Sequence, residues 1–451
     1  MDYVPASPDD IRKMLDIVGV EKIEDIVKSV PSDIKAGKID LPEGISEFDA
    51  GIEIKKLALL NRDLDHYISF LGAGAYDHFI PAVVPGLASR SEFVTAYTPY
   101  QPEASQGTLQ AIFEYQSMIC EITGLDVANA SLYDGGSACA EAAMMIVNAH
   151  PGKKELLVAE SVHPYYKTVI QTYLENIDVK IKIVPSDKGV INPQTIDNFV
   201  SCDTAGMIVQ SPNFFGCIED VKILADKIHN IGGSLAMACN PISLGILSSP
   251  RELGADIAIG EGQPLGVDLC YGGPYFGFIS CRENLMRKLP GRIVGATLDH
   301  NNKRCFVLTL QAREQHIRRE KATSNICSNQ ALMALRGCIY LCWLGKEGFY
   351  ELSKQNALKA HYAAKLACGI KGVSLAFNTP FFNEFCLRIE SGIKLKDIID
   401  RTCAQKVFAG VEIRQLDANL PDLLLVSVTE KRTGEEINKW VQVLDNAINS
   451  K

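Results

Sequence analysis

The sequence lacks the closely spaced cysteine and histidine ligands from which metal sites are built. It contains 14 cysteines among 451 residues, and the closest pair, Cys338 and Cys342, is four positions apart. A structural zinc site needs four such ligands clustered at short spacings. Most of the cysteines lie among aliphatic residues, as Cys120 and Cys281 do, where a free thiol packs as a small hydrophobic side chain. We therefore expect no metal site, and reduced thiols typical of a cytosolic protein.

An excess of positive charge is also missing. Lysine and arginine number 45 and the acidic residues 54, a net charge of −9, which argues against general binding to nucleic acid or to an anionic membrane surface. The N-terminus has no basic segment followed by an apolar one, so it is not a secretory signal. The longest run without charge, 231–250, is interrupted by serine, glycine and proline and cannot span a bilayer. The expected location is the cytoplasm.

The signatures of several enzyme classes are absent too. There is no Gly-x-Ser-x-Gly elbow, no His-Glu-x-x-His pair and no Walker loop. Hydrophobic residues make up 47% and charged residues 22% of the chain, which is a globular composition. The length favours more than one packed domain.

The pattern of apolar residues divides the chain into three predicted parts. Residues 1–60 form a helical extension, with helices at 8–18 and 23–30 and a third that ends near Asn61. Residues 61–329 alternate short aliphatic runs with amphipathic segments, which predicts an α/β domain with a mostly parallel sheet covered on both faces. The runs lie at 156–159, 179–184, 207–209, 235–238, 257–259 and 276–279. Residues 330–451 form a small α/β domain: a long helix to about Ala367, strands at 384–389, 411–415 and 423–428, and helices at 395–405 and after Thr433.

The first candidate site is the loop 97–107, in which Glu103 is the single charged residue. Tyr97, Pro99, Tyr100 and Pro102 make it rigid and aromatic, and its phenol groups could reach a ligand or a partner chain. A loop that only packs inside the subunit is about as consistent with this spacing.

Two further candidates are anion- or ring-binding positions. The turn at Gly135, Gly136 and Ser137 precedes a helix made of small residues, where backbone N–H groups could hold a phosphate. His163 follows the strand at 156–159, at the edge where ligands bind in parallel sheets. An ordinary capped turn and a structural histidine explain these features nearly as well.

The glycine-rich segment 254–277 and the charged segment 311–325 complete the candidates. Glycines around two short strands indicate the close approach of a ligand or another chain. The second segment packs seven ionisable residues into a short span, which is usually a solvated face and more rarely an interface or an anion site.

Several of these blocks resemble the glycine cleavage system P-protein, in particular subunit 1 of its two-subunit form. The matching blocks are Phe-Leu-Gly-Ala-Gly-Ala-Tyr-Asp-His-Phe-Ile-Pro at 70–81, Thr-Pro-Tyr-Gln-Pro-Glu at 98–103 with the helix 106–123, Asp-Val-Ala-Asn-Ala-Ser at 126–131, Gly-Glu-Gly-Gln-Pro-Leu-Gly at 260–266, Pro-Gly-Arg-Ile-Val-Gly at 290–295 and the run 313–327.

The resemblance implies a type I pyridoxal-phosphate-dependent transferase-like fold, with a seven-stranded-type sheet in the large domain. It also implies a glycine dehydrogenase (aminomethyl-transferring, decarboxylating) activity within a heteromeric complex with two copies of each subunit. That complex decarboxylates glycine and passes the aminomethyl group to the lipoyl arm of H-protein. Pyridoxal phosphate supplies the electron sink for this chemistry.

The sequence departs from a working site of that fold at two positions. Gln263 stands where the Schiff-base lysine is expected, and Ala238 where an aspartate should hold the pyridinium nitrogen. Gly135, Gly136, Ser137 and His163 then form a vestigial cradle without its reactive groups. The resemblance therefore implies that subunit 2 binds the cofactor, that this chain binds none, and that this chain completes the partner's active site.

Within that reading, the loop of Tyr97, Thr98, Pro99, Tyr100 and Gln101 is expected to line the partner's substrate channel. Two alternatives stay open. The chain could be a pure assembly subunit, or a pyridoxal-phosphate enzyme in its own right with a lysine from elsewhere in the fold.

Overall fold

The structure is a computed structural model that describes residues 6–35, 40–322, 324 and 330–449. The chain forms two compact units, Met1–Arg62 and Asp63–Lys451. The predicted domain boundaries at 60/61 and 329/330 stay predictions.

The described residues of the first unit contain three helices. Helix α1 (Pro8–Val18) begins with Ser7 and Asp10 in a capping box and ends at Gly19, whose φ of 78° is left-handed. Helix α2 (Ile23–Ile26) is shorter than the predicted 23–30, because the chain leaves the helix at Val27 and continues in turns. Helix α3 is Glu47–Ala58. The described parts of all three helices contain no buried residue, so this unit has no core of its own.

A seven-stranded sheet forms the centre of the second unit, as predicted. Its strand order is β2-β10-β9-β8-β7-β3-β4, and only β10 runs antiparallel to its neighbours among the described strands. The strands are β2 (Val127–Ala128), β3 (Glu155–Ala159), β4 (Lys180–Val184), β7 (Thr204–Gln210), β8 (Ser234–Ala238), β9 (Ile257–Glu261) and β10 (Gly277–Cys281).

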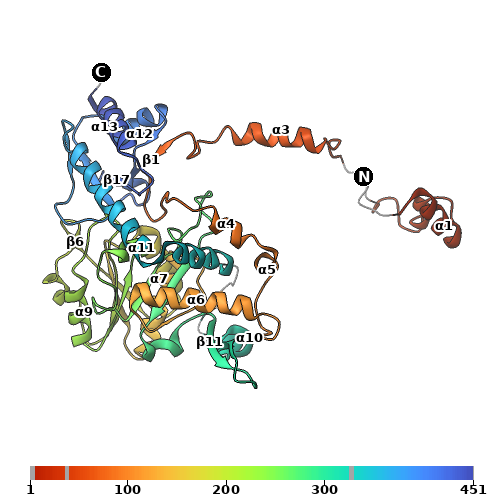
Figure 1. Cartoon of the computed structure of the whole chain (residues 1–451), viewed down its shortest axis with the longest axis horizontal. Helices are drawn as coiled ribbons and strands as arrows, with labels where there is room; N and C mark the ends of the chain where they lie inside the picture. The colour runs from red at the N-terminus through yellow and green to blue at the C-terminus, as the bar shows by residue number, and fades with distance from the viewer. Residues whose placement is uncertain (1–5, 36–39, 323, 325–329, 450–451) are drawn as a thin grey trace. The chain divides into compact units, whose positions relative to one another are not determined.

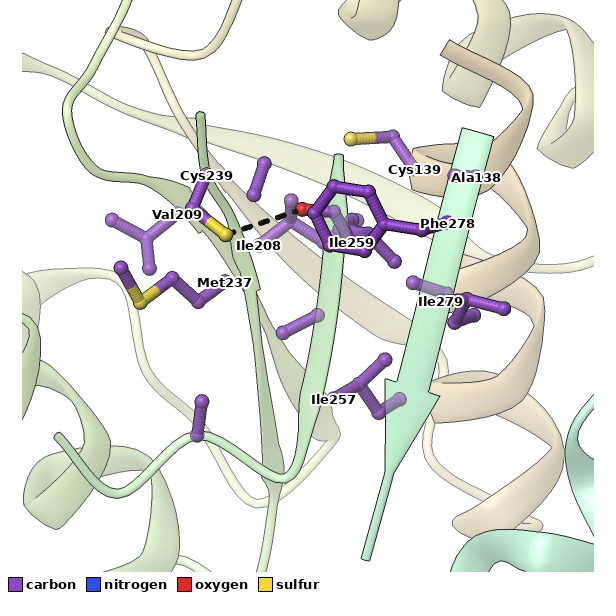
Figure 2. Packing of buried hydrophobic residues seen from close by; sticks show 14 of the residues in the cluster. Ala138, Cys139, Ile208, Val209, Met237, Cys239, Ile257, Ile259, Phe278 and Ile279 are labelled. Carbon is purple, nitrogen blue, oxygen red and sulfur yellow. Dashed lines mark hydrogen bonds between the residues drawn. The ribbon is translucent and has the colours of Figure 1, made fainter. Parts of the chain in front are cut away.

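Consecutive residues of the central strands are buried, so both faces of the sheet are covered. All five residues of β8 and of β10 are buried, although neighbouring residues point to opposite faces. Figure 2 shows part of this core, with Met237 on β8, Ile257 on β9 and Phe278 on β10, all buried. The connecting helices include α6 (Gln106–Thr123), α7 (Gly135–Ala149), α8 (Pro164–Leu174) and α9 (Val221–Asn230).

A smaller four-stranded sheet lies in the C-terminal part, in the order β13-β14-β17-β16. Its strands are β13 (Val373–Leu375), β14 (Glu384–Ile389), β16 (Val411–Glu412) and β17 (Leu424–Ser427), and helices α12 (Leu395–Ala404) and α13 (Gly434–Asn449) accompany it. Helix α13 begins with a capping box, because Glu436 N donates to Thr433 Oγ1 and Thr433 N to Glu436 Oε2.

Helix α11 (Ala331–Ala367) connects the two sheets along the length of the second unit (Figure 1). Its early residues, such as Ala334 and Cys338, pack in the large core, and later ones, such as Ala360, pack around Trp440 in the small core. The predicted long helical region is confirmed, and it contains one interruption that was not predicted: Gly345 has φ 60° and ψ −174°, which divides α11 into two segments.

The structure corrects several other predictions. The strand predicted at 411–415 ends at Glu412 and continues as a 3-10 turn, Ile413–Gln415. Strand β13 was not predicted. The sequence analysis also missed the hairpin of β11 (Ile293–Leu298) and β12 (Arg304–Thr309), the pair β5 (Ser186–Asp187) and β6 (Val190–Ile191), and the pair β1 (Ile68–Ser69) and β15 (Val407–Phe408). Helices α4 (Val83–Ala88), α5 (Ser91–Val94) and α10 (Gln315–Arg318) complete the second unit's α-helices in the described residues.

Candidate functional site

A narrow cleft lies where the parallel strands end. Gln210 ends β7, Ala238 ends β8 and Glu261 ends β9, and His163 follows β3. These residues line a cavity of about 30 Å³. That volume holds about one water molecule, whereas small-molecule sites measure about 300–1,000 Å³. The sequence-predicted positions Ala238 and His163 are therefore brought together, but around a filled space.

Gln263 fastens the backbone of Tyr76 to this cleft. Its side chain is almost fully buried. Tyr76 N donates to Gln263 Oε1 at 2.8 Å, and Gln263 Nε2 donates to the carbonyl oxygens of Tyr76 at 2.9 Å and Val267 at 2.8 Å. The amide thus has a partner for its acceptor and for both of its donor hydrogens, which is what a buried amide requires.

Glu384, from β14 of the small sheet, reaches the same segment. The Tyr76 hydroxyl donates to Glu384 Oε2 at 2.6 Å, and Ala73 N donates to Glu384 Oε1 at 2.8 Å. A Cβ at Gly72 would overlap the Glu384 carboxyl group, so only glycine fits there. The segment 72–76 therefore lies inside the cleft, between the two sheets.

The turn before α7 is closed in the same way. Asp134 caps the helix by accepting a hydrogen bond from Ser137 N at 2.7 Å. Gly135 N donates to Glu261 Oε2 at 3.0 Å. A Cβ at Gly135 would meet the Tyr166 hydroxyl, and one at Gly136 would touch Val169. The helix start faces the chain's own side chains.

His163 stacks on a ring of its own chain. Its imidazole lies 4.8 Å from the Tyr166 ring at an interplanar angle of 28°. Nδ1 accepts from Tyr165 N, so Nε2 carries the hydrogen that it donates to Ala73 O at 3.0 Å. Burial lowers the pKa of His163 to about 4, and the side chain is neutral at pH 7.

Two carboxyl groups in the cleft have raised pKa values. Burial raises the pKa of Glu261 to about 8, despite hydrogen bonds from Gly135 N and Gln263 N. Burial likewise raises the pKa of Glu384 to about 7, against the lowering effect of the hydrogen bonds from Tyr76 and Ala73. Perturbed carboxyl groups often mark catalytic sites, but here they bind only groups of this chain.

These residues do not fit pyridoxal phosphate. No lysine lines the cleft, the Glu261 carboxyl group occupies the helix start that would receive a phosphate, and the remaining volume is about 30 Å³. The chemistry of the donor set is therefore that of a closed structural network.

An open pocket of about 380 Å³ lies elsewhere on the second unit, beside the predicted loop. Tyr97, Thr98, Pro99 and Tyr100 line it, whereas Gln101 is exposed and lies outside the lining. Opposite the loop, the pocket is bounded by residues of the charged segment and of the 290–295 block, namely Arg292, Arg313, Glu314, Gln315 and His316. Residues 323 and 325–329 of the charged segment lie outside the described residues.

Tyr100 is held by charged and aromatic neighbours in this pocket. Arg292 Nη2 donates to the Tyr100 hydroxyl at 3.1 Å, and the guanidinium lies 5.5 Å from the ring centroid. His316 meets the same ring edge-on at 5.6 Å. Because Arg292 can only donate, the Tyr100 hydroxyl keeps its own hydrogen for another acceptor.

Arg313 and Glu314 shape the wall behind Tyr100. Arg313 donates to the carbonyl oxygens of Leu289, Gly291 at 3.0 Å and Leu310 at 3.2 Å, which fixes the backbone around Gly291. Burial lowers its pKa. Glu314 lies 3.6 Å from Arg292 Nε, so the two form an ion pair at the pocket wall.

A second, apolar pocket of about 250 Å³ adjoins the first. The two pockets share Tyr97, Ile112, Ala130 and Ala331 in their linings. The second is otherwise lined mainly by aliphatic side chains of α5, α6 and α11, together with Phe93 and Tyr115. A ligand with a polar part and an alkyl part would match this pair of pockets.

Known proteins resemble this chain over most of its length. A family model described as glycine cleavage system P-protein matches residues 1–444. The chain belongs to the glycine cleavage system P-protein family. Proteins described as probable glycine dehydrogenase (decarboxylating) subunit 1 from Desulfitobacterium hafniense and Moorella thermoacetica are each 48% identical to it, over 442 and 445 residues. The first alignment covers 98% of both chains, the second 98% of this chain and 99% of its relative.

Solved structures agree with the P-protein assignment. A crystal structure of glycine decarboxylase (P-protein), in inhibitor-bound form, has a TM-score of 0.88 and 40% identity, and the match covers 99% of this chain and all of the other. A glutamate decarboxylase from Lactobacillus brevis has a TM-score of 0.68 at 12% identity, covering 94% and 97% of the two chains. The predicted type I pyridoxal-phosphate-dependent fold is thereby confirmed.

The sequence analysis missed the two residues that fill the cleft of this P-protein chain. Tyr76 lies in the 70–81 block, but nothing in that block indicates that its ring enters the cleft. Glu384 lies 308 positions away at the start of the mainly apolar strand β14, and a charged residue at that place was the only available signal.

The described residues contain neither a group of metal ligands nor a helix that could span a membrane. They contain no group of three or more potential ligands arranged to hold a metal ion. No helix among them is both long enough and apolar enough to cross a membrane.

Proposed function

We propose that this chain is the non-catalytic subunit 1 of a two-subunit, cytoplasmic glycine dehydrogenase (decarboxylating). A second subunit binds pyridoxal phosphate, which supplies the electron sink for loss of carbon dioxide from glycine. The complex transfers the aminomethyl group to the lipoyl arm of H-protein. In this proposal the chain contributes a surface to the partner's active site and no group that bonds to the cofactor.

The observation that carries the proposal is the environment of Gln263. It stands two residues beyond the end of β9, and all its hydrogen-bonding capacity is used on backbone groups of this chain. A neutral amide cannot form a Schiff base. A chain of this family with a filled cleft contributes to glycine decarboxylation only through another chain.

The pocket beside Tyr100 supports a role at the partner's active site. Pro99 and Pro102 restrict the loop, so the tyrosine rings are presented without a large loss of entropy on binding. The adjoining apolar pocket matches the alkyl part of a lipoyl arm, and the Tyr100 hydroxyl and Arg292 offer donors to a carbonyl or carboxylate oxygen. We infer that this face lines the channel through which the arm reaches the cofactor.

Reconstitution tests the proposal. The chain should co-purify with the second subunit, and only the mixture, supplied with pyridoxal phosphate and lipoylated H-protein, should release carbon dioxide from glycine. Borohydride reduction should attach the cofactor to a lysine of the second subunit. Full activity of this chain by itself, with cofactor reduced onto one of its own lysines, would support the stand-alone enzyme and contradict the proposal.

The assembly role differs from this proposal in one measurable respect. A pure assembly subunit restores activity through folding and association alone, so conservative changes in the pocket would leave turnover untouched. The direct donor contact between Arg292 and the Tyr100 hydroxyl favours the channel role, because it positions an exposed hydroxyl group.

A further inference from the structure

The cleft at the end of the large sheet contains groups from three distant parts of the chain. Gln263 lies just beyond β9, Glu384 on β14, and Tyr76 in the segment that precedes α4. Their hydrogen bonds to one another and to Ala73 measure 2.6–2.9 Å. The group that fills the cleft is thus a built network, with contributions from both sheets.

We propose that this network excludes a phosphate-bearing ring by occupancy: the Glu261 carboxyl group takes the phosphate position, and Tyr76, held by Gln263 and Glu384, takes the ring space. This inference goes beyond the missing lysine. It states that the cleft would refuse the cofactor even if a lysine were supplied.

The position that a phosphate would take is the start of α7. The first N–H groups of a helix have no partner within the helix and attract anions. Ser137 N is bonded to Asp134, and Gly135 N to Glu261 Oε2 at 3.0 Å. Glu261 Oε1 also accepts from Gln263 N at 3.1 Å. A phosphate would have to displace this carboxyl group and leave two backbone donors to reorganise.

The segment 72–76 fills the space that the ring of the cofactor would need. Glycine at 72 allows the backbone to pass against the Glu384 carboxyl group, and the His163 side chain donates to Ala73 O at 3.0 Å. The His163 ring stacks on Tyr166, so the stacking face is used within the chain. About 30 Å³ remains, too little for any aromatic ring.

Thermal unfolding with inorganic phosphate tests the first half of the proposal on the full-length chain. Inorganic phosphate at about 10 mM should not stabilise the wild type relative to chloride of equal ionic strength. This concentration is about ten times the Kd of a phosphate site with a Kd of ~1 mM. Glu261→Ala frees both backbone donors, and its melting temperature should rise with phosphate by about 2 °C. Glu261→Gln keeps the position filled and is the matched control, with no response. Stabilisation of the wild type by phosphate, or equal responses of the two variants, would overturn the assignment.

Reductive labelling tests the second half. Gln263→Lys supplies the amine but leaves Glu261 and Glu384 in place. After incubation with pyridoxal phosphate, borohydride reduction and peptide mapping, position 263 should carry no more label than exposed lysines of the same protein. Selective labelling at position 263 would show that the missing lysine alone excluded the cofactor.

These outcomes are separable from those of the proposed partnership. Dialysis of the wild-type chain with pyridoxal phosphate, which involves no variant, should leave no bound cofactor, and retained cofactor would refute occupancy even if every variant failed to fold. Decarboxylation by the reconstituted complex tests the partnership and is unaffected by whether the chain's own cleft refuses phosphate because of Glu261.

Discussion

The pH dependence of stability provides a direct test of the buried Glu384. Burial raises the pKa of this carboxyl group from the ordinary 4.5 to about 7, against the opposing hydrogen bonds from Tyr76 and Ala73. A shift of that size corresponds to about 3 kcal/mol between the two protonation states. The perturbation we choose is Glu384→Gln, which keeps the shape, removes the titration and retains an amide that can bond to both neighbours.

The sign follows from proton binding. Between the unfolded pKa near 4.5 and the folded pKa near 7, the folded chain holds a proton that the unfolded chain has lost. The free energy of unfolding therefore falls as the pH rises through this window, and the loss is nearly complete above pH 8. Relative to Glu384→Gln, the wild type should lose about 3 kcal/mol of unfolding free energy between about pH 5 and about pH 8.5, a range that brackets this window.

Urea unfolding of both proteins at a series of pH values measures this difference. Glu390→Gln is the matched control, because Glu390 is exposed and directly follows the last residue of β14. Its stability should follow that of the wild type at every pH. Comparing proteins at the same pH removes the contributions of all other groups, provided the unfolding slopes agree. A wild-type curve parallel to that of Glu384→Gln, or one that gains stability with rising pH, would refute the raised pKa and the closed environment that causes it.

Three further predictions follow from the same contacts. Tyr100→Phe removes a half-exposed hydroxyl, so glycine turnover in the reconstituted complex should fall several-fold while the melting temperature changes by less than about 2 °C; Tyr271→Phe, at a 90% exposed ring, is the control, and unchanged turnover would make the loop structural. Burial alone would raise the pKa of Glu430, but His78 and the backbone N–H of Phe79 lower it to about 2, so Glu430→Gln should destabilise the chain most above about pH 4.5 and by progressively less below it; a loss of stability that stays equal across this range would contradict this. The isolated chain should self-associate in sedimentation and become a defined complex on adding subunit 2, because apolar side chains of the second unit such as Trp343 and Leu358 are exposed; a clean monomer indifferent to the second subunit would argue against an obligate partnership.

The large sheet could be predicted from sequence because its signals are local. Runs such as 257–259 are aliphatic on both faces, and a buried parallel strand has that composition wherever it occurs. The capping residues of α1 and α13 likewise act on backbone groups three residues away. By contrast, β1 and β15 are two-residue strands that exist only because they pair with each other across more than 300 positions, so neither segment carries a strand pattern of its own.

The candidate site likewise combines features that the local sequence predicts with features that depend on distant parts of the chain. Four of the five loop residues expected to line a channel do line a pocket, because closely spaced prolines and tyrosines in a loop indicate exposure and rigidity locally. Gln263 could be singled out only as a missing lysine, since its actual role depends on a backbone 187 positions away. A buried amide is costly unless every donor and acceptor is used, and the Tyr76 backbone together with Val267 O uses all of them. Gln263 is therefore held in place by the same requirement that holds any buried polar group. Gln263→Lys would lose the acceptor for Tyr76 N and would bury an ammonium group that cannot accept a hydrogen bond, so the cleft disfavours lysine at this position.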